Sequence, residues 1–438
     1  MARGRAQREA AVVGLAAAGS PGGAPTRAAC QALVAGRAAP SALPVDLPRL
    51  EPRFCVDVGA PVADLAVGER CGQPCLFAAA GSTVQALDAA GRAVAVMRTA
   101  AAVQVLHWWP KCGLLLVGCE DDQVLAFDAH GRQRWAFASQ EDPAVFQAAK
   151  QYWFRSAPGH GGIHGLDSGP FHQGRLQAFV GSACTLEVLE ADGSLCRRLP
   201  VFWGPGSRFA LVPGPAGGTD LLVARQPADG AGLSVVDSET LQVRASNAYN
   251  SVPAGHTADC GGFASTTRQH LLLADVDGDG APELVSEVNG TLSRVTVWEL
   301  GSGRALASAQ FGTVSLEGGR TMGREGRRAL GVRDLDAVDL DGDGRIEILV
   351  ALATGRVVAL DGACRPLWSR RLDSPPLVLG GLSGRGVVVG TEDGAVLRLD
   401  ASGRPAAQGC VRGAPMHLAL LGGEWAVVGT DQGRVALL

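Results

Sequence analysis

The chain has 438 residues, 47% of them hydrophobic and 19% charged, which supports a buried core and excludes a disordered chain. Its formal net charge of −4 gives no electrostatic reason to expect nucleic-acid binding. The 60 glycines and 24 prolines are spread along the sequence, as in an all-β fold with many short turns.

Residues 1–50 form an Ala- and Pro-rich N-terminal segment. It begins with basic residues, continues with a short apolar run and reaches small residues of the kind found at signal-peptide cleavage sites. The competing interpretation is a pair of Ala-rich helices, 7–18 and 26–37, followed by a Pro-rich linker over 38–52. The second predicted region, 51–438, contains the remaining elements, and its sequence has no apolar run of membrane-spanning length.

From residue 54 onward one short pattern recurs: an alternating apolar strand, an acidic turn with a nearby glycine, and a second strand. Period-two alternation indicates a strand, and Asp or Glu followed by Gly indicates a tight turn. Each copy follows another pair of apolar runs, which gives four strands per repeat at a spacing of roughly 40 to 60 residues, typical of propeller blades. The copies occupy 84–96, 124–137, 186–199, 233–246, 295–308, 357–370 and 396–409.

The two ends of the second region predict ring closure. The last repeat, 414–438, stops after its third strand, and an orphan strand, 53–59, precedes the first full repeat. That orphan strand can complete the last blade and remove an exposed edge, whereas an open solenoid would need polar caps. We therefore predict an all-β fold: a closed β-propeller of eight four-stranded blades, with seven as the alternative count.

Two long insertions between repeats are candidate binding surfaces, because loops on a rigid scaffold commonly carry functional residues. The insertion 148–174 offers Trp153 and His172, and the stretch 247–265 offers the residues Tyr249, Asn250 and His256. Aromatic rings beside imidazole and amide groups suit a sugar or an acidic ligand. The competing interpretation of Trp153 is a side chain that fills the groove between blades.

An enzyme is the alternative class, although the sequence contains no GxSxG, P-loop, HExxH or dinucleotide motif in context. A polysaccharide lyase needs a base that removes a proton beside a carboxylate, often with a cation that neutralises this carboxylate. The insertion 148–174 supplies the candidates Lys150, Tyr152, Arg155, His160 and His164. Glycines between the two histidines oppose the helix that would align them as zinc ligands.

Two segments, 271–285 and 335–350, contain the pattern D-x-D-G-D-G-x-x-E. Carboxylates at positions one, three and five can face one point, and the position-seven carbonyl and position-nine Glu can close an all-oxygen shell that suits calcium. The competing interpretation is two acidic turns. EF-hands are excluded because no Glu stands at position twelve and strands flank both segments. The predicted ligands of two structural Ca²⁺ ions are Asp275, Asp277, Asp279 and Glu283 in one segment and Asp339, Asp341, Asp343 and Glu347 in the other.

These acidic segments resemble the loops of the FG-GAP (integrin α-like, VCBS) repeat family, whose propellers bind calcium between the first two strands of a blade. The resemblance is specific for the fifth and sixth repeats. Other repeats, such as 355–372, resemble PQQ-like and WD-type repeats, but the adjacent cysteine pair of quinone dehydrogenases is missing from the sequence. The FG-GAP resemblance implies adhesion, glycan recognition or scaffolding, and some calcium propellers, including rhamnogalacturonan lyases, are enzymes.

The 11 cysteines show no CxxC pair, and most lie in apolar, strand-like sequence, so we expect small buried side chains. Pairing of Cys71 with Cys75, or of Cys112 with Cys119, is the alternative in an oxidising compartment. Trp135 and Trp368 occupy equivalent positions in the last strands of two repeats and are predicted to be packing residues.

The sequence thus predicts a non-catalytic, calcium-stabilised β-propeller that binds a glycan or protein partner through loops on one face. The alternative is a calcium-dependent, lyase-like enzyme that acts on polysaccharides. Neither interpretation involves nucleic acid or a membrane span, and the propeller is expected to be a monomer or part of a larger multidomain protein. Calcium loops favour a periplasmic or secreted location, whereas the short apolar run near the N-terminus leaves a cytoplasmic location open.

Overall fold

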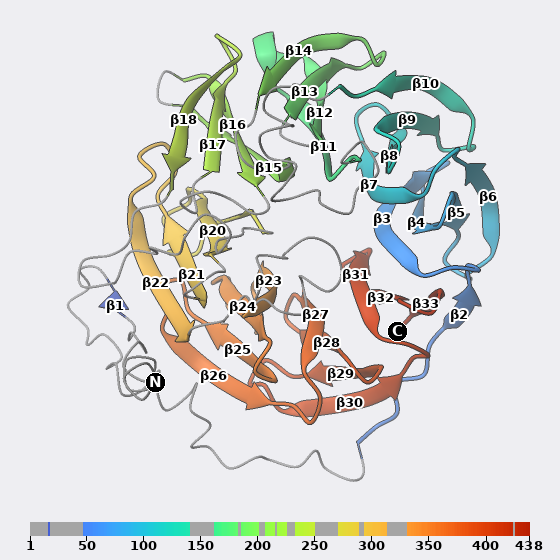
Figure 1. Ribbon diagram of the computed structural model, residues 1–438. Helices are drawn as coiled ribbons and strands as arrows, with labels where there is room; N and C mark the ends of the chain where they lie inside the picture. The colour runs from blue at the N-terminus through green and yellow to red at the C-terminus, as the bar shows by residue number, and fades with distance from the viewer. Residues whose placement is uncertain are drawn as a thin grey trace, which may run out of the picture.

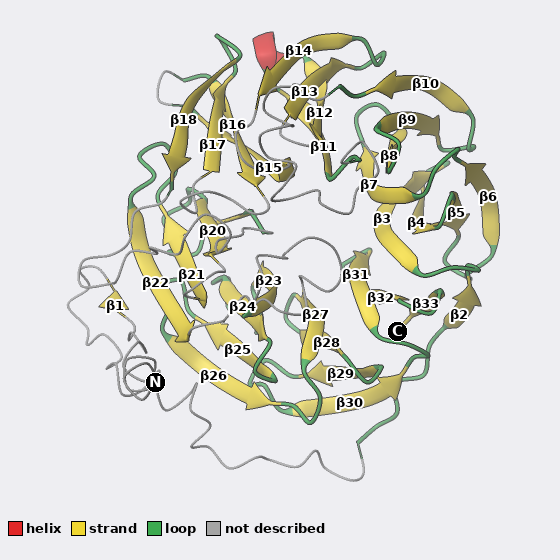
Figure 2. Cartoon of the chain, in the orientation of Figure 1, coloured by secondary structure: helices red, strands yellow, loops and turns green. Residues whose placement is uncertain are grey.

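The computed structural model describes residues 16–17, 47–140, 162–182, 185–200, 206–214, 217–225, 233–249, 270–288, 293–312, 331–423 and 425–438. These residues form eight antiparallel sheets that circle a central axis (Figure 1). Within the described ranges, the helical element is a single 3-10 turn, η1 (His172–Gly174), and strands dominate the fold (Figure 2). The predicted closed, eight-bladed β-propeller is confirmed.

Each blade is a four-stranded meander whose first strand lies nearest the central channel and whose fourth lies at the rim (Figure 1). Blade 1 contains β3 (Val62–Arg70), β4 (Gln73–Ala80), β5 (Thr83–Leu87) and β6 (Ala93–Arg98). Blade 2 contains β7 (Val103–Trp109), β8 (Leu114–Cys119), β9 (Gln123–Asp128) and β10 (Gln133–Ala138). Blade 3 contains β11 (Gly165–Pro170), β12 (Leu176–Ser182), β13 (Thr185–Glu190) and β14 (Leu195–Pro200). Blade 4 contains β15 (Gly206–Pro213), β16 (Thr219–Arg225), β17 (Leu233–Asp237) and β18 (Gln242–Ala248).

The second half of the ring repeats this arrangement. Blade 5 contains β19 (Leu272–Ala274), β20 (Glu283–Val288), β21 (Ser293–Trp298) and β22 (Ala305–Gly312), and β1 (Ala16–Ala17) pairs with β22. Blade 6 contains β23 (Val332–Val338), β24 (Glu347–Leu352), β25 (Arg356–Leu360) and β26 (Pro366–Arg371). Blade 7 contains β27 (Pro376–Leu382), β28 (Gly386–Thr391), β29 (Ala395–Leu399) and β30 (Pro405–Cys410). Blade 8 contains β31 (Pro415–Leu421), β32 (Trp425–Thr430), β33 (Arg434–Leu437) and, at its rim, β2 (Phe54–Asp57).

The hydrophobic core lies between neighbouring blades. One cluster joins Val285 and Val297 of blade 5 to Val350 and Leu360 of blade 6. Because a blade is covered on both sides, its middle strands are apolar along their whole length, and every residue of β24 and β28 is buried. The rim strand β6, in contrast, is exposed at three of its six positions and buried at only one.

The ring closes where β2 pairs with β33, from Phe54 opposite Leu437 to Asp57 opposite Arg434. The Asp57 carboxylate lies 3.2 Å from the Arg434 guanidinium, which adds an ion pair to the ladder. Just before β2, the guanidinium carbon of Arg53 lies 3.4 Å from the ring centre of Trp425 in β32, a cation–π contact. The predicted completion of the last blade by an N-terminal strand is therefore confirmed.

Aromatic side chains of the rim strands pack on glycines of the next blade. The indole of Trp135 covers Gly193 and donates a hydrogen bond from Nε1 to the Ala191 carbonyl at 3.1 Å. Trp368 covers Gly403 in the same way and donates to the Ala401 carbonyl at 2.8 Å. A Cβ atom on either glycine would lie 2.6 Å from the indole ring, and φ is positive at both positions, so both must be glycine. The predicted packing role of the two tryptophans is confirmed.

The eight cysteines of the described ranges are free thiols, so the alternative pairings Cys71–Cys75 and Cys112–Cys119 do not form. Of these eight, Cys75, Cys119 and Cys364 are buried, but Cys55 and Cys410 are exposed because they lie on the rim strands β2 and β30, so the prediction of mostly buried cysteines is wrong for the described ranges. Burial raises the pKa of the Cys75 and Cys119 thiols to about 11. In the same ranges, no helix is long and apolar enough to cross a bilayer.

Candidate functional site

The two acidic loops occupy the same position in adjacent blades. One joins β19 to β20 in blade 5 and the other joins β23 to β24 in blade 6, so each connects the first two strands of its blade. In an antiparallel meander, the first and third connections lie at the same edge of the sheet. Both loops therefore lie on one face of the ring, with the turns that join the third and fourth strands.

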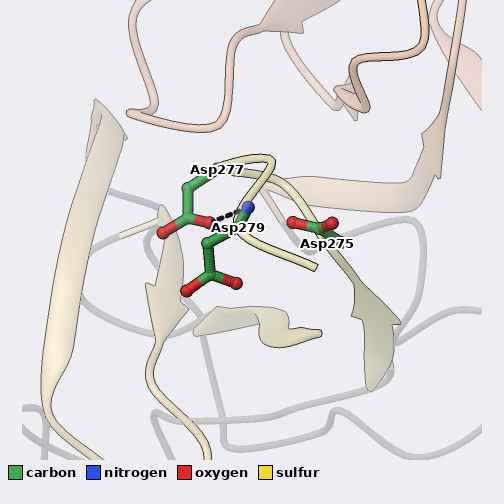
Figure 3. A group of neighbouring side chains, drawn as sticks. All are labelled: Asp275, Asp277 and Asp279. Carbon is green, nitrogen blue, oxygen red and sulfur yellow. Dashed lines mark hydrogen bonds between the residues drawn. The ribbon is translucent and has the colours of Figure 1, made fainter. Parts of the chain in front are cut away.

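Backbone amides organise the carboxylates of the blade 5 loop (Figure 3). Asp275 accepts hydrogen bonds from the N–H groups of Gly278, at 2.8 Å, and Gly280, at 2.9 Å. Asp277 accepts a bond from the Asp279 N–H at 3.1 Å, the dashed contact in Figure 3. The two glycines have φ values of +82° and +91°, which few other residues adopt, and this backbone makes the tight turn possible.

The blade 6 loop repeats this hydrogen bonding almost atom for atom. Asp339 accepts bonds from the N–H groups of Gly342, at 2.7 Å, and Gly344, at 3.0 Å. Asp341 accepts a bond from the Asp343 N–H at 3.2 Å. Corresponding distances in the two loops thus differ by only 0.1 Å, so both sequences fold into one local structure.

The spacing that the two loops share places the Glu of each at its base, on the second strand. Glu283 accepts a hydrogen bond from the Val276 N–H at 3.0 Å, and Glu347 accepts one from the Leu340 N–H at 2.8 Å. Burial raises the pKa of both glutamates, and the negative charges of the loop aspartates raise each pKa further. The carboxylates therefore repel one another, as expected of groups that a cation would neutralise.

In each loop, three side chains offer oxygen atoms that lie within 4.8 Å of one another. The sets are Asp275, Asp277 and Asp279 in blade 5 and Asp339, Asp341 and Glu347 in blade 6. Six of the eight predicted ligands are thus gathered into two groups, whereas Glu283, the first residue of β20, and Asp343, in the blade 6 loop, fall outside them. The donors are all oxygens, so the residues present fit a hard divalent cation such as Ca²⁺.

Each acidic loop also contacts the following blade. A Cβ atom on Gly362, in the β25–β26 turn of blade 6, would lie 1.8 Å from the carbonyl oxygen of Val276 in the blade 5 loop. In the next interface, the Gly384 N–H of blade 7 donates to the Asp339 carbonyl at 3.0 Å. The loops therefore form part of the interfaces between blades 5, 6 and 7.

A groove of about 1040 Å³ runs between the two acidic loops and the β25–β26 turn. Its walls combine acidic, basic and apolar side chains. They include Asp277, Glu283, Asp341, Asp343, Glu347, Arg345, Arg365, Leu306, Ile346, Leu367 and Trp368. Leu367 is 53% exposed, the most exposed of the large hydrophobic residues in the described ranges. The groove therefore offers an apolar contact surface beside both candidate cation sites.

Seven predicted site residues fall on the two insertions, outside the described ranges. They are Lys150, Tyr152, Trp153, Arg155, His160, Asn250 and His256. Two candidates of the 148–174 insertion are described, as is Tyr249 of the 247–265 stretch. His164, half-buried just before β11, donates its backbone N–H to the Gly181 carbonyl at 2.8 Å. His172 lies in η1, where Nδ1 is 2.6 Å from the Ser238 carbonyl oxygen, so its ring links blade 3 to blade 4.

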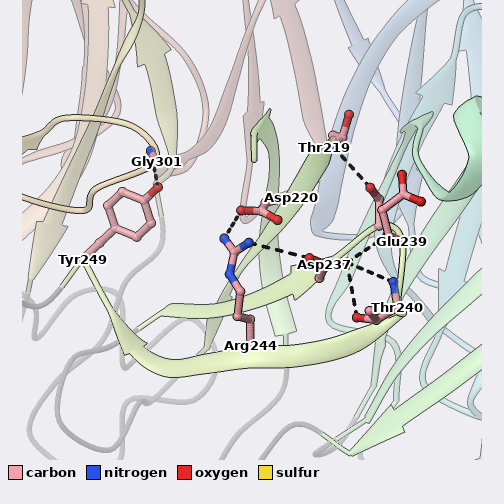
Figure 4. Close-up of polar contacts among 9 residues, drawn as sticks. Thr219, Asp220, Asp237, Glu239, Thr240, Arg244, Tyr249 and Gly301 are labelled. Carbon is pink, nitrogen blue, oxygen red and sulfur yellow. Dashed lines mark hydrogen bonds and ion pairs between the residues drawn. The ribbon is translucent and has the colours of Figure 1, made fainter. Parts of the chain in front are cut away.

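Tyr249 lies in the interface between blades 4 and 5 and is only 5% exposed. Its hydroxyl accepts a hydrogen bond from the Gly301 N–H at 3.2 Å (Figure 4), and burial raises the pKa of the phenol. Nearby, Arg244 pairs with Asp220 and lies 3.6 Å from Asp237 (Figure 4). The buried Tyr249 ring packs between blades rather than presenting a face to a ligand.

A cavity that sequence reasoning missed lies in the central channel. It measures about 360 Å³, and its charged lining residues are Asp64, Arg208, His270, Arg333, Asp334 and His417. Four of these residues each follow a register shift near the start of a first strand: Asp64, Arg208, Asp334 and His417. In the sequence, a polar residue that recurs at this point of the repeat was the signal that could have indicated the cavity. These residues lie toward the face opposite the acidic loops, because first strands start at that end.

No family model matches this sequence, and no curated protein matches it. Solved structures do match its fold. Sqt1 from Saccharomyces cerevisiae aligns with a TM-score of 0.61 and 12% identity over 90% of this chain and 99% of that chain. BamB from Moraxella catarrhalis aligns with a TM-score of 0.55 and 13% identity over 90% of this chain and 99% of that chain. The C-terminal WD40 domain of Sif2 aligns with a TM-score of 0.55 and 12% identity over 90% of this chain and 98% of that chain. At these identities the comparison shows the propeller fold.

Proposed function

We propose that this protein is a non-catalytic, calcium-stabilised propeller that binds a protein partner through the face that carries the acidic loops. The observation behind the proposal is that two structurally equivalent acidic loops flank one large groove on one face. A rigid ring that holds loops and grooves in fixed positions is suited to recognition. The resemblance of these loops to FG-GAP repeats supports the same assignment.

Calcium would be held by the carboxylates of Asp275, Asp277, Asp279 and Glu283 in blade 5 and of Asp339, Asp341, Asp343 and Glu347 in blade 6. Bound Ca²⁺ supplies positive charge that offsets the repulsion among four carboxylates. Each loop then keeps the conformation in which it contacts the next blade. In this role calcium is structural, and the groove keeps its shape because both of its loops are fixed.

The apolar part of the groove favours a protein partner over a glycan. Leu306, Ile346 and Leu367 contribute aliphatic surface, which suits the side chains of a peptide. Sugar rings are usually recognised by aromatic faces. Trp368 is the aromatic side chain of the described lining, and its indole N–H is already bonded to the Ala401 carbonyl.

Site-specific photo-crosslinking tests the proposed docking face. A photo-reactive amino acid at Leu367, inside the groove, is compared with one at Val96, which is 50% exposed on the rim strand β6. We expect a discrete crosslinked protein at position 367 but not at position 96, and we expect EGTA to reduce its yield. Equal crosslinking at both positions, or none at position 367 in cells that express the protein naturally, would contradict the proposal.

The lyase-like alternative stays a prediction. Of its five candidate residues, His164 is described. It lies just before β11 and lines neither the groove nor the central-channel cavity.

A further inference from the structure

The central-channel cavity is a second candidate binding site, on the opposite face from the groove. Besides its charged residues, it is lined by aliphatic side chains of the first strands: Leu65, Val105, Leu106, Leu166, Leu377, Val378, Met416 and Leu418. Its volume of about 360 Å³ falls within the usual range of small-ligand pockets. A ligand there would meet an apolar wall and a few fixed polar groups.

The carboxylates of this cavity are occupied by protein donors. Asp64 accepts bonds from the N–H groups of Leu65, at 2.9 Å, and Leu106, at 2.8 Å. Asp334 accepts a bond from the Leu379 N–H at 2.7 Å and also interacts with His270. Both carboxylates link the first strands of adjacent blades, so the hydrogen bonds that they accept stabilise the contacts between blades.

Three of the four basic side chains are likewise in contact with acidic groups. His270 lies between Glu287, at 3.1 Å, and Asp334, at 2.9 Å. Arg333 is 8% exposed and pairs with Glu392 at 2.6 Å. His417 lies 3.5 Å from Asp64. These contacts hold the three basic side chains in place around the cavity.

Arg208 differs from these three residues, because it is exposed and lines the cavity. A guanidinium carries five N–H donors, and Arg208 donates a hydrogen bond from Nη1 to the carbonyl of its neighbour Ser207 at 2.9 Å. Within the described ranges no carboxylate forms an ion pair with it. Asp167 interacts with it electrostatically, and the same carboxylate lies 3.7 Å from His107 Nε2 and accepts a hydrogen bond from the Ser168 N–H at 2.7 Å.

We propose that the central channel binds an aliphatic carboxylate, with the carboxylate on Arg208 and the aliphatic body against the Leu and Val side chains of the first strands. A fork of parallel N–H donors is the usual protein partner of a carboxylate. The chemistry is shared by the C-terminus of a peptide, an acidic side group flanked by aliphatic residues, and a free short-chain acid. This site is independent of the groove and of calcium.

Methyl NMR on the full-length protein tests the proposal. The sequence has four methionines, of which Met416 lines the cavity and Met97 lies in the core between blades 1 and 2. In protein labelled with ¹³C at the methionine methyl groups, Met416→Leu assigns the reporter signal. We expect 4-methylpentanoate to shift the Met416 signal but not the Met97 signal, and 4-methylpentanamide to shift neither.

Substitutions then identify the anchor. Arg208→Gln should weaken the binding of 4-methylpentanoate about tenfold or more, because a charge-assisted pair is lost. Arg208→Lys, which keeps the charge, should weaken the binding of 4-methylpentanoate less, and it replaces the Gln variant in this test if that variant does not fold. Arg404→Gln, on an exposed turn of blade 7, should bind like the wild type.

Peptides separate the sources of the carboxylate. Binding of acetyl-Leu-Ala-Leu with a free C-terminus, but not of its C-terminal amide, indicates a peptide terminus. Binding of acetyl-Leu-Glu-Leu-amide indicates an acidic side group. Binding of 4-methylpentanoate alone indicates a free acid. The proposal is overturned if no carboxylate shifts the Met416 signal, or if Arg208→Gln leaves the affinity unchanged. Either result leaves the crosslinking test at Leu367 unaffected.

Discussion

The imidazole of His270 joins two blades through two acidic residues. Its Nε2 lies 2.9 Å from the Asp334 carboxylate of blade 6, and its Nδ1 lies 3.1 Å from the Glu287 carboxylate of its own blade. Burial disfavours the charged ring, but the two carboxylates outweigh this effect and raise the pKa of His270 to about 9. The cationic ring therefore stabilises the interface between blades 5 and 6 at neutral pH.

This pKa predicts how stability depends on pH. The folded pKa of about 9 lies above the ordinary value of 6.5, so the stabilisation is complete below pH 6.5 and is lost as pH rises through 9. We expect wild type to exceed His270→Gln in free energy of unfolding by about 1–3 kcal/mol at pH 6, and by much less at pH 10. Urea titrations of both proteins at the two pH values measure the difference, and a constant difference would contradict the assignment.

Gly362→Ala tests the contact between the blade 5 loop and blade 6. The new Cβ would lie 1.8 Å from the Val276 carbonyl oxygen, so the loop or the turn must move. We expect a loss of about 1–3 kcal/mol in the free energy of unfolding. Gly218→Ala is the matched control, because the nearest atom to its Cβ is 3.4 Å away. Thermal melts of the two variants should differ clearly, and equal melting temperatures would show that the contact is not tight.

Ring closure can be weakened at the contact between Arg53 and Trp425. Arg53→Gln removes a guanidinium 3.4 Å from the ring centre, which should cost about 0.5–2 kcal/mol. Arg49→Gln is the control, since its ion pair with Glu51 is exposed and should contribute little. A double-mutant cycle with Trp425→Leu isolates the pair. A coupling energy near zero would show that β2 is held by its ladder alone.

Trp368→Leu should destabilise the interface between blades 6 and 7. The substitution removes the indole that covers Gly403 and the hydrogen bond to Ala401, and we expect a loss of about 2–4 kcal/mol. Leu367→Ala, at the exposed neighbouring position, should cost far less. Urea denaturation measures both, and a similar loss for the two variants would argue against the packing role of Trp368.

The features that the sequence predicted correctly are those that repeat with a local signature. Alternating strands and acidic turns indicated the blades, and the strand at 53–59 indicated closure, because both follow from short-range patterns. The partners of the rim tryptophans were missed, although Gly193 and Gly403 stand in those acidic turns, because the contact joins different blades. The channel residues Arg208 and His270 share no motif, and the polar position that Arg208 shares with other first strands does not by itself indicate a cavity. Their proximity comes from the register of first strands around the ring, which no single repeat encodes.

Calorimetric titration of the chelator-treated, full-length protein with Ca²⁺ tests the central claim most directly. Asp277→Asn and Asp341→Asn disable one loop each, and Glu239→Gln removes an exposed acidic group elsewhere. The account predicts two Ca²⁺ per molecule for wild type and Glu239→Gln, one for each Asn variant, and a higher melting temperature with calcium than with EGTA. Absence of binding heat in wild type, with melting temperatures that calcium does not change, would contradict it.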